Sequence, residues 1–433
     1  MRILAFDHFY TQDLDALQNV LGESDYLFRL PYRRWHSVAR RCFASAAFDG
    51  LSRAYDHDME SAWKKFGLFV ERETEWLIAV RRPELLLLPS DAFFYVRPFV
   101  ESFARRGVKT FVMQKETTIS PLVMEKHSEQ VGKYVPFMSD FMTVCSERHR
   151  EFWLRAGTDP SKVAVTGQPR FDVYAEKSAV PPGEKKRLLY LSFDDNAYLP
   201  SDIGLDHDGD WSQMRLEIEK VVSEFSDRYD VVVKKHPQQS RSPSNLGSDV
   251  READRAADTR RLILDADVVV AFQTTAIYEA IACGKPVIYA AWGKTFESVK
   301  STLIPFEKVS GMVHHACDSL RLQQLLDDDS LFNEAISAPA MEEVRLHLGP
   351  IDGMASRRAL EHMTRFTMQP IPQNVRTREF LRRSLSVFPF AIFGLASLVM
   401  ATFSKDLARR LRGRARDARS NVHEVLAALG GGG

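Results

Sequence analysis

Continuous apolar runs, separated by charged and helix-like stretches, constrain the fold of this chain more than any other feature. In the second half they include "LLYLSF" (188–193), "DADVVVAF" (265–272) and "KPVIYAA" (285–291), and runs at 84–90 and 109–114 repeat the pattern in the first half. Unbroken runs of Val, Ile and Leu are typical of parallel strands buried on both faces, and such strands are joined by helical crossovers. The sequence therefore predicts an α/β protein with two doubly wound, Rossmann-like domains in tandem.

The length of the chain and one polar stretch set the predicted domain boundaries. A chain of 433 residues exceeds what one core usually supports, so we expect two domains. The stretch "AEKSAVPPGEKKR" is polar, rich in proline and unpatterned, as expected of an interdomain linker. The predicted order is a Rossmann-like domain, the linker, a second Rossmann-like domain, a closing helix and a C-terminal tail, at 1–174, 175–187, 188–348, 349–368 and 369–433.

Composition excludes several classes of function. The chain has 58 basic and 58 acidic residues, so no global field attracts nucleic acid, and any anion-binding function must be local. The four cysteines show no CxxC and no Cys/His metal pattern, which favours ordinary thiols in a reducing compartment. The N-terminus moves directly into a strand-like run, so we expect no cleaved secretory signal.

The far end of the chain carries an apolar segment, Leu385 to Phe403, which runs for 19 residues without a charge between basic flanks. Such a segment predicts membrane contact, and basic residues on both sides favour a re-entrant or in-plane segment, broken near Pro389, over a single span. The arginine-rich tail that follows lacks interleaved aromatic residues, so we expect anionic lipid rather than RNA as its partner. The alternative is a hydrophobic hairpin packed on the protein or on a second copy.

The stretch "VVVKKHP" indicates a local site for an anion. An apolar strand ends there on Lys234, Lys235 and His236, and Pro237 terminates the ladder. Because side chains alternate along a strand, we expect only one of the two lysines to face a ligand. The alternative for these lysines is a solvated strand end.

A second stretch, "DADVVVAFQTTAIYEAIACGKPVI", predicts a strand followed by a helix. Thr274 or Thr275 is placed to cap that helix, and Gly284 to end it. Helix N-termini at strand ends bind anions, and Glu279, one turn into the helix, is placed to accept hydrogen bonds from ribose or sugar hydroxyls. A plain N-cap is the alternative, but two such signals at strand ends of one sheet favour a shared anion site.

Together these stretches resemble the C-terminal half of two-domain (GT-B type) enzymes of bacterial surface-carbohydrate synthesis. That group includes capsule polysaccharide glycosyltransferases, CDP-glycerol glycerophosphotransferase-like proteins and, more distantly, UDP-N-acetylglucosamine 2-epimerases. "AVTGQPRFDVY" resembles their segment before the linker, and "GPIDGMASRRALEHM" resembles their closing helix, so the similarity covers roughly Val80 to Met363.

The resemblance implies roles for individual residues in the second half. His236 and the Lys234/Lys235 pair would contact a donor diphosphate, and Glu279 would contact ribose or sugar. The usual Ser or Asn-Ser before the helix is replaced here by Gln273, Thr274 and Thr275. The resemblance implies that the two threonines bind phosphate and that Gln273 belongs to the donor-binding residues.

Candidates for a catalytic acid or base follow strands of the first half. Asp7 and His8 follow the first strand, Asp91 follows "LLLLPS", and Glu116 follows "KTFVMQ". A doubly wound sheet places its reactive loops at such strand ends, and a transferase needs a group that deprotonates the acceptor hydroxyl. Asp91 and Glu116 also fall roughly where the resembling epimerases carry acid/base carboxylates. As alternatives, His8 is a packed core histidine and Asp91 a helix N-cap.

An acidic loop, "DHDGDWSQMRLE", has calcium-loop spacing, but Trp211 stands where the sharp turn requires glycine. We therefore expect a solvated loop and no metal or other cofactor.

The resulting hypothesis is a nucleotide-sugar-dependent glycosyltransferase of bacterial surface polysaccharide or glycolipid synthesis at the cytoplasmic face of the inner membrane. Its expected partners are a nucleotide-sugar donor, a glycan or lipid-linked acceptor and anionic lipid. The alternatives are a UDP-N-acetylglucosamine 2-epimerase-like isomerase, a glycerophosphotransferase and a non-catalytic scaffold.

Overall fold

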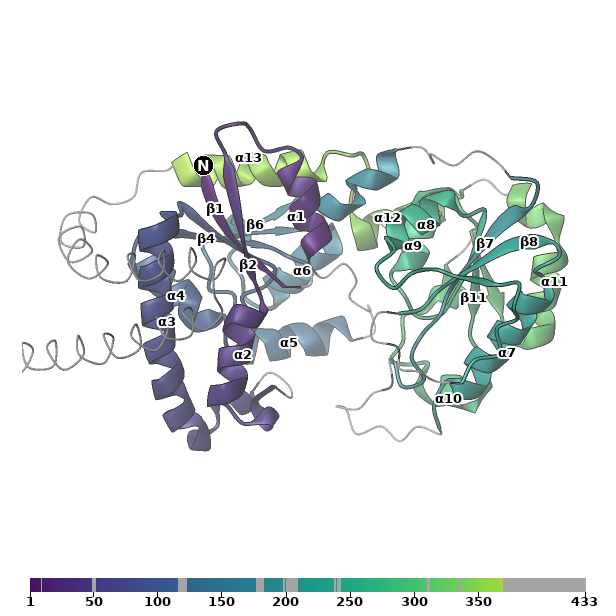
Figure 1. Cartoon of the computed structure of the whole chain (residues 1–433), viewed down its shortest axis with the longest axis horizontal. Coiled ribbons are helices and arrows are strands. Elements are labelled where there is room, and N and C mark those ends of the chain that lie inside the picture. The colour runs from purple at the N-terminus through teal and green to yellow at the C-terminus, as the bar shows by residue number, and fades with distance from the viewer. Residues whose placement is uncertain are drawn as a thin grey trace, which may run out of the picture.

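The computed structural model of the chain shows two parallel β-sheets, each flanked by helices (Figure 1). It describes residues 1–8, 10–48, 52–115, 123–176, 183–197, 199, 209–236, 239, 243–309, 312–333 and 336–368. The predicted apolar segment Leu385–Phe403 and the arginine-rich tail lie outside these residues, as do residues 177–182 of the predicted linker. Among the helices of the described part, none combines the length and the apolar character that crossing a membrane requires.

The first sheet has six strands in the order β2-β1-β3-β4-β5-β6, and every neighbouring pair is parallel. Its strands are β1 (Arg2–Asp7), β2 (Tyr26–Pro31), β3 (Leu85–Leu88), β4 (Lys109–Met113), β5 (Phe141–Val144) and β6 (Val163–Val165). The strand-like run at the N-terminus and the runs at 84–90 and 109–114 correspond to β1, β3 and β4, whereas β2 was not predicted.

The second sheet has six parallel strands in the order β12-β11-β10-β7-β8-β9. Its strands are β7 (Lys186–Leu191), β8 (Tyr229–Lys234), β9 (Arg251–Glu252), β10 (Val268–Ala271), β11 (Val287–Ala290) and β12 (Val313–Ala316). Read from β9 this is the Rossmann order, and the strand order reverses between β7 and β10. The two sheets confirm the predicted α/β class with two Rossmann-like units.

Helices cover the sheets. The helices between strands of the first sheet are α1 (Thr11–Gln18), α2 (Arg33–Cys42), α3 (Glu60–Arg81), α4 (Arg97–Arg105), α5 (Met124–Tyr134) and α6 (Glu147–Arg155). The later helices are α7 (Ser212–Glu224), α8 (Thr259–Asp265), α9 (Ala276–Ala282), α10 (Gly293–Val299), α11 (Ser319–Asp327), α12 (Ala338–Leu348) and α13 (Ala355–Met368). Short 3-10 turns are η1 (Ser45–Phe48), η2 (Arg53–Tyr55), η3 (His57–Met59), η4 (Pro160–Lys162), η5 (Pro169–Ala175), η6 (Phe306–Lys308) and η7 (Asp329–Asn333).

The last helix, α13, returns from the second sheet to the first, where Figure 1 shows it beside β1. Ala359 and Met363 of α13 share a buried cluster with Ile3 of β1 and Leu87 of β3. The carboxylate of Asp172 in η5 accepts hydrogen bonds from the first backbone amides of this helix, at 2.8 and 2.9 Å. The helix predicted to close the fold is therefore present, and it ties the end of the described chain to its beginning.

Candidate functional site

A cavity of about 690 Å³ lies at the carboxyl ends of β7, β8 and β10, beside the reversal of strand order in the second sheet. We call it the strand-end cavity. Its lining residues are Gln12, Arg170, Leu191, Ser192, Phe193, Asp194, Asn196, Ala197, Lys234, Lys235, His236, Thr259, Arg260, Phe272, Thr274, Thr275, Ala276 and Glu279. Ligands of open α/β sheets bind at such a switch point, because loops from adjacent strands leave a crevice there. The structure thus brings His236, Thr274 and Thr275 to one cavity.

Lys234, the last residue of β8, and Lys235 line this cavity, but their ammonium groups already have partners. Lys234 Nζ donates hydrogen bonds to the backbone oxygens of Asp254, at 2.9 Å, and Arg255, at 2.6 Å. Lys235 Nζ pairs with the Glu252 carboxylate at 2.7 Å. Burial lowers the pKa of Lys234, although this ammonium group keeps two acceptors. Both lysines therefore contribute positive charge to the wall, and neither presents an isolated ammonium group.

His236 is the third residue of this strand end. Its imidazole is partly buried, and this burial lowers its pKa, while the negative charge of Asp194 partly opposes the shift. The backbone amide of His236 donates to Gln239 Oε1 at 3.3 Å, and Gln239 Nε2 donates to Ser192 Oγ at 3.1 Å. The ends of β7 and β8 are therefore linked through one glutamine side chain.

The Thr-Thr pair directly precedes α9, as predicted. Thr275 is the N-cap residue, but its side chain makes no capping hydrogen bond, whereas Thr274 Oγ1 accepts one from the Ala276 amide at 3.3 Å. Gly284 has a φ of 70° just beyond the end of the helix, a conformation that glycine adopts without strain. Both threonine residues line the cavity, where their hydroxyl groups can donate hydrogen bonds to an anionic ligand.

Gln273 differs from the expectation that it binds the donor. Its amide group is buried away from the strand-end cavity and donates to the Tyr289 hydroxyl, at 2.7 Å, and to the Ile304 backbone oxygen, at 2.8 Å. Its Oε1 accepts from the Ile304 amide at 3.1 Å. Gln273 also has a positive φ of 35°, a conformation that costs about 1–3 kcal/mol in a non-glycine residue. In this structure Gln273 fixes the turn that presents Thr274 instead of contacting the cavity.

Glu279 lines the cavity and lies against the segment that precedes the second sheet. The Tyr174 hydroxyl of η5 donates a hydrogen bond to Glu279 Oε2. Burial raises the pKa of Glu279, and the bond from Tyr174 offsets part of that rise. Glu279 thus has a protein partner on one oxygen. Its predicted contact with ribose or sugar stays a prediction.

Two arginines of the cavity were not singled out from the sequence. Arg170, which lies within the quoted "TGQPRFD" stretch, pairs with the buried Asp13 of α1 at 3.2 Å. Arg260 pairs with Asp258 and donates to the backbone oxygen of Arg170 at 2.8 Å. Gln12 Nε2 also donates to Asp258 Oδ1, at 3.2 Å, so α1 of the first half contacts the second half at this cavity.

Asp7, His8 and Asp91 lie at the carboxyl ends of their strands, as predicted, but none of these three lines the strand-end cavity. His8 is 5% exposed and packs against the rings of Tyr32 and Phe93, with its Nε2 3.4 Å from the Tyr95 hydroxyl. Burial lowers its pKa to about 4, helped by the nearby charge of Lys115. This environment agrees with the alternative of a packed core histidine. Asp7 accepts a hydrogen bond from the Thr11 hydroxyl at 2.8 Å.

Asp91 is fully buried after β3 and has a structural contact that its sequence position did not reveal. Its Oδ2 accepts hydrogen bonds from the backbone amides of Met138, at 3.0 Å, and Ser139, at 2.8 Å. Burial raises the pKa of Asp91, and these two amides offset part of the rise. Its carboxylate does not cap a helix, contrary to the alternative considered, and holds a neighbouring loop instead. Glu116, the remaining candidate, lies outside the described residues.

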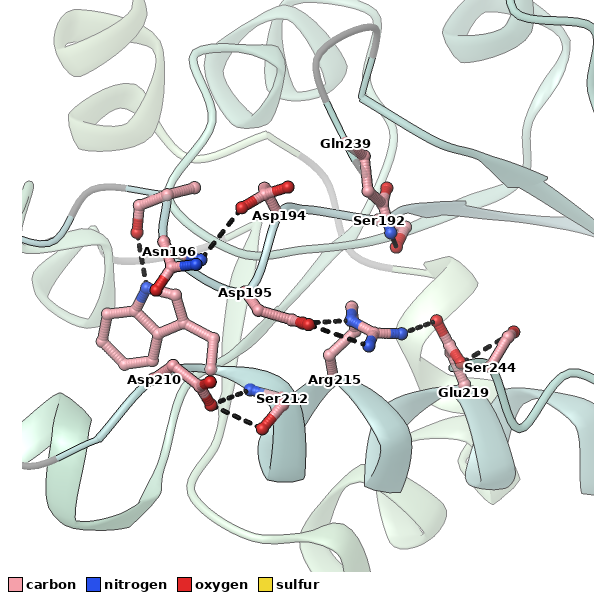
Figure 2. A network of polar contacts seen from close by, with 12 residues as sticks. Ser192, Asp194, Asp195, Asn196, Asp210, Ser212, Arg215, Glu219, Gln239 and Ser244 are labelled. Atoms are coloured by element: carbon pink, nitrogen blue, oxygen red, sulfur yellow. Dashed lines mark hydrogen bonds and ion pairs between the residues drawn. The ribbon is translucent and has the colours of Figure 1, made fainter. Parts of the chain in front are cut away.

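A buried ion-pair network, shown in Figure 2, adjoins the cavity through Asp195, which lies between the lining residues Asp194 and Asn196. Arg215 of α7 is 1% exposed and pairs with Asp195 at 2.6 Å and with Glu219 at 2.7 Å. Glu219 Oε2 in turn accepts from Ser244 Oγ at 2.9 Å and from the Asn245 amide at 2.8 Å. One helix thus fixes the loop that follows β7 and a segment that lies between β8 and β9.

The acidic stretch with calcium-loop spacing is only partly described. Asp206 and Asp208 lie outside the described residues, and Asp210 Oδ1 accepts hydrogen bonds from the Ser212 amide and hydroxyl. Among the residues with described positions, no three His, Cys, Asp or Glu side chains cluster in a way that would bind a metal ion.

Comparisons with known proteins agree with this architecture. Two similar solved structures are the wall teichoic acid polymerase TagF, at 10% identity, and a UDP-N-acetylglucosamine 2-epimerase, described as putative, from Listeria monocytogenes, at 14% identity. The first match covers 84% of this chain and 89% of that one with a TM-score of 0.52, and the second covers 86% and 98% with a TM-score of 0.51. At these identities the likeness establishes the fold alone.

A comparison with curated proteins finds no match. The family model described as CDP-Glycerol:Poly(glycerophosphate) glycerophosphotransferase matches residues 108–330, a stretch that contains the strand ends around His236 and Thr274. Because that stretch makes up more than half of the chain, the protein belongs to the CDP-glycerol:poly(glycerophosphate) glycerophosphotransferase family.

Proposed function

We propose that the protein is a transferase of surface-polymer synthesis that moves a polyol phosphate or a sugar from a nucleoside diphosphate donor to an acceptor hydroxyl. The family description names CDP-glycerol and glycerophosphoryl transfer, so glycerophosphoryl transfer is the first activity to test. Transfer of a sugar, the activity expected from the sequence, is the second version of the same proposal.

One observation carries the proposal, the convergence of anion-binding groups on the strand-end cavity. His236 and the two lysines come from the end of β8, Thr274 and Thr275 from the turn after β10, and Arg170 and Arg260 from the contact between the two halves. Cationic and hydroxyl groups at a switch point are suited to a diphosphate, because they supply both charge and hydrogen-bond donors.

In glycerophosphoryl transfer, the acceptor oxygen forms a bond to the distal phosphorus of the donor. The bond from that phosphorus to the bridging oxygen breaks, and the nucleoside monophosphate leaves with the electron pair. The guanidinium groups of Arg170 and Arg260, and the imidazole of His236 as a hydrogen-bond donor, are suited to stabilise the charge that develops on the leaving phosphate. The proton of the acceptor hydroxyl passes to a base, for which Asp7 and Glu116 of the first half are proposed.

The two halves have separate tasks in this proposal. The second binds the donor, and the first presents the acceptor, so Gln12 and Arg170 mark the place where both meet. We propose that the segment Leu385–Phe403 holds the protein at the cytoplasmic face of a bacterial membrane, near a glycan or lipid-linked acceptor. The chemistry as proposed requires no metal ion.

The test is donor consumption by the full-length protein with and without acceptor. The protein is incubated with CDP-glycerol, and separately with UDP-N-acetylglucosamine, with a lipid-linked glycerophosphate primer present or absent. We expect release of nucleotide only when the primer is present, and loss of this release in His236→Ala. Conversion of UDP-N-acetylglucosamine to its epimer without any primer would establish an isomerase instead. Absence of binding to any nucleotide in a thermal-shift screen of UDP, CDP, GDP and ADP would contradict a donor site altogether.

A further inference from the structure

The turn that follows β7 places a carboxylate in the cavity that also contains Lys234, Arg170 and Arg260. Asp194, Asn196 and Ala197 of this turn line the strand-end cavity. Among the described residues that line it, the acidic side chains are Asp194 and Glu279, and Glu279 is engaged by Tyr174. Asp194 interacts electrostatically with His236, which comes from the neighbouring strand end. The cavity therefore contains a hydrogen-bond-accepting carboxylate, that of Asp194, together with several groups that attract anions.

Three hydrogen bonds hold the turn that carries this carboxylate. Asp194 Oδ1 accepts a hydrogen bond from the Asn196 amide at 3.1 Å, which sets the direction of the carboxylate. Trp211 donates from its backbone amide to the Asp195 backbone oxygen, at 2.8 Å, and from its ring to the Ala197 backbone oxygen, at 2.5 Å. The carboxylate of Asp195 points the other way, to Arg215, as Figure 2 shows. A preorganised turn of this kind selects its ligand without first having to be ordered.

A carboxylate beside a diphosphate site discriminates between two kinds of ligand group. It accepts hydrogen bonds from hydroxyls and has no donor of its own when ionised, so it repels phosphate oxygens at short range. Phosphate is therefore favoured near Thr274, Thr275 and His236, whereas a hydroxyl-bearing group is favoured near Asp194. Asn196, with an amide that both donates and accepts, can bind a second hydroxyl at the same end.

We propose that Asp194 is a specificity-determining residue that binds the hydroxyls of the group being transferred, a polyol or a sugar, with Asn196 as its neighbour. This inference rests on the proposed function, because it assigns the part of the donor beyond the diphosphate. The ribose of the nucleotide lies elsewhere in this assignment.

The test compares two donors that differ only in hydroxyl groups, CDP-glycerol and CDP esterified with propanol. Dissociation constants are measured by calorimetry for the full-length protein, for Asp194→Asn and for Asp227→Asn, a matched change at an exposed position after α7. We expect the wild type and Asp227→Asn to prefer CDP-glycerol by about tenfold, a difference of about 1.4 kcal/mol, since hydrogen bonds to charged groups are worth that much or more. In Asp194→Asn the preference should fall to about twofold, while affinity for the propyl ester stays equal or improves.

A second variant guards against a folding defect in the first. Asn196→Ala keeps the backbone amide that orients Asp194 and should lose part of the same preference, about two- to fivefold. Equal weakening of both ligands in Asp194→Asn would place Asp194 on the nucleotide and overturn the inference, as would an unchanged preference. Failure of the wild type to bind either ligand or CDP itself would instead contradict the proposed function.

Discussion

The carboxyl ends of the two sheets are built on the same plan but use their polar residues differently. At the first sheet, His8 is packed among aromatic rings and Asp91 is buried against two backbone amides. At the second sheet, His236 and Thr274 line a cavity of about 690 Å³. A polar residue after an apolar strand is therefore an ambiguous signal, because the same pattern serves packing in one sheet and an open site in the other.

The difference follows from what neighbouring strands contribute. In the second sheet, three strand ends around the reversal of strand order each provide polar residues to the same space. In the first sheet the loop 92–96 after β3 is rich in aromatic residues, and Phe93 and Tyr95 cover the imidazole of His8. The side chains that follow a strand, rather than the strand itself, thus decide whether its end stays open.

The largest effect is expected from the buried ion-pair network around Arg215, next to the carboxyl ends of the second sheet. Arg215→Met leaves the carboxylates of Asp195 and Glu219 without their buried partner, so we expect the free energy of unfolding to fall by about 3–5 kcal/mol. The matched change Arg228→Met breaks pairs in which the arginine is 36% exposed, and should cost at most about 1 kcal/mol. Urea denaturation of both variants gives the two values, and equal losses would mean that the Arg215 pairs are open to water.

The two histidines provide the next contrast. His236→Ala should lower donor turnover by about 100-fold, or about 2.7 kcal/mol, because a group aimed at the developing phosphate charge is lost. His8→Phe keeps an aromatic ring among the aromatic neighbours of His8, so turnover should stay within about threefold. Rates are compared per folded molecule, with folding checked by thermal melting. The reverse pattern would move the catalytic histidine to the first sheet.

Asp91 allows a third contrast, between stability and activity. Asp91→Ala leaves the buried amides of Met138 and Ser139 without an acceptor, so we expect a loss of about 2 kcal/mol in the free energy of unfolding. Asp194→Ala lies at the cavity surface and should cost less than about 1 kcal/mol. Chemical denaturation measures both changes. A folded Asp91→Ala protein without any turnover would show that Asp91 takes part in the chemistry after all.

How far the sequence predicts this structure depends on the burial of each element. Interior strands such as β7 and β10 were predicted because they are buried on both faces and therefore uniformly apolar. The edge strands β2 (Tyr26–Pro31) and β12 (Val313–Ala316) were not, because their burial is mixed and their residues include Arg29, His314 and His315. Short runs with mixed polarity do not carry a clear period.

The site shows the same limit at the level of single residues. The positions of His236 and Thr274 followed from strand ends that are visible in the sequence. The contact between Gln273 and Ile304 joins residues 31 positions apart, so no local pattern could separate Gln273 from the threonines beside it. Asp194 was missed because it belongs to a turn without a recognisable motif. Only the order of the strands, with β7 between β8 and β10, places that turn in the cavity.

The smallest effect is expected in the pH dependence of donor binding, which compares His236 of the second sheet with His8 of the first. Burial lowers the pKa of His236 in the free protein, and a bound diphosphate should raise it, because the anion stabilises the imidazolium. Binding then takes up a proton, so affinity should be highest below the pKa of the free imidazole and fall, by up to about tenfold, as the pH rises through the pKa of the imidazole in the complex. CDP-glycerol is the proper ligand, since its esterified diphosphate does not titrate in this range.

His236→Asn should abolish the pH dependence of donor binding. His8→Phe should not, because the pKa of His8 is already lowered to about 4 and its imidazole stays neutral throughout the window. Calorimetry in buffers of different ionisation enthalpy counts the protons taken up. A count of zero in the wild type would show that His236 serves the donor as a neutral hydrogen-bond partner, so that the contrast with His8 would be one of access to the cavity and not of charge.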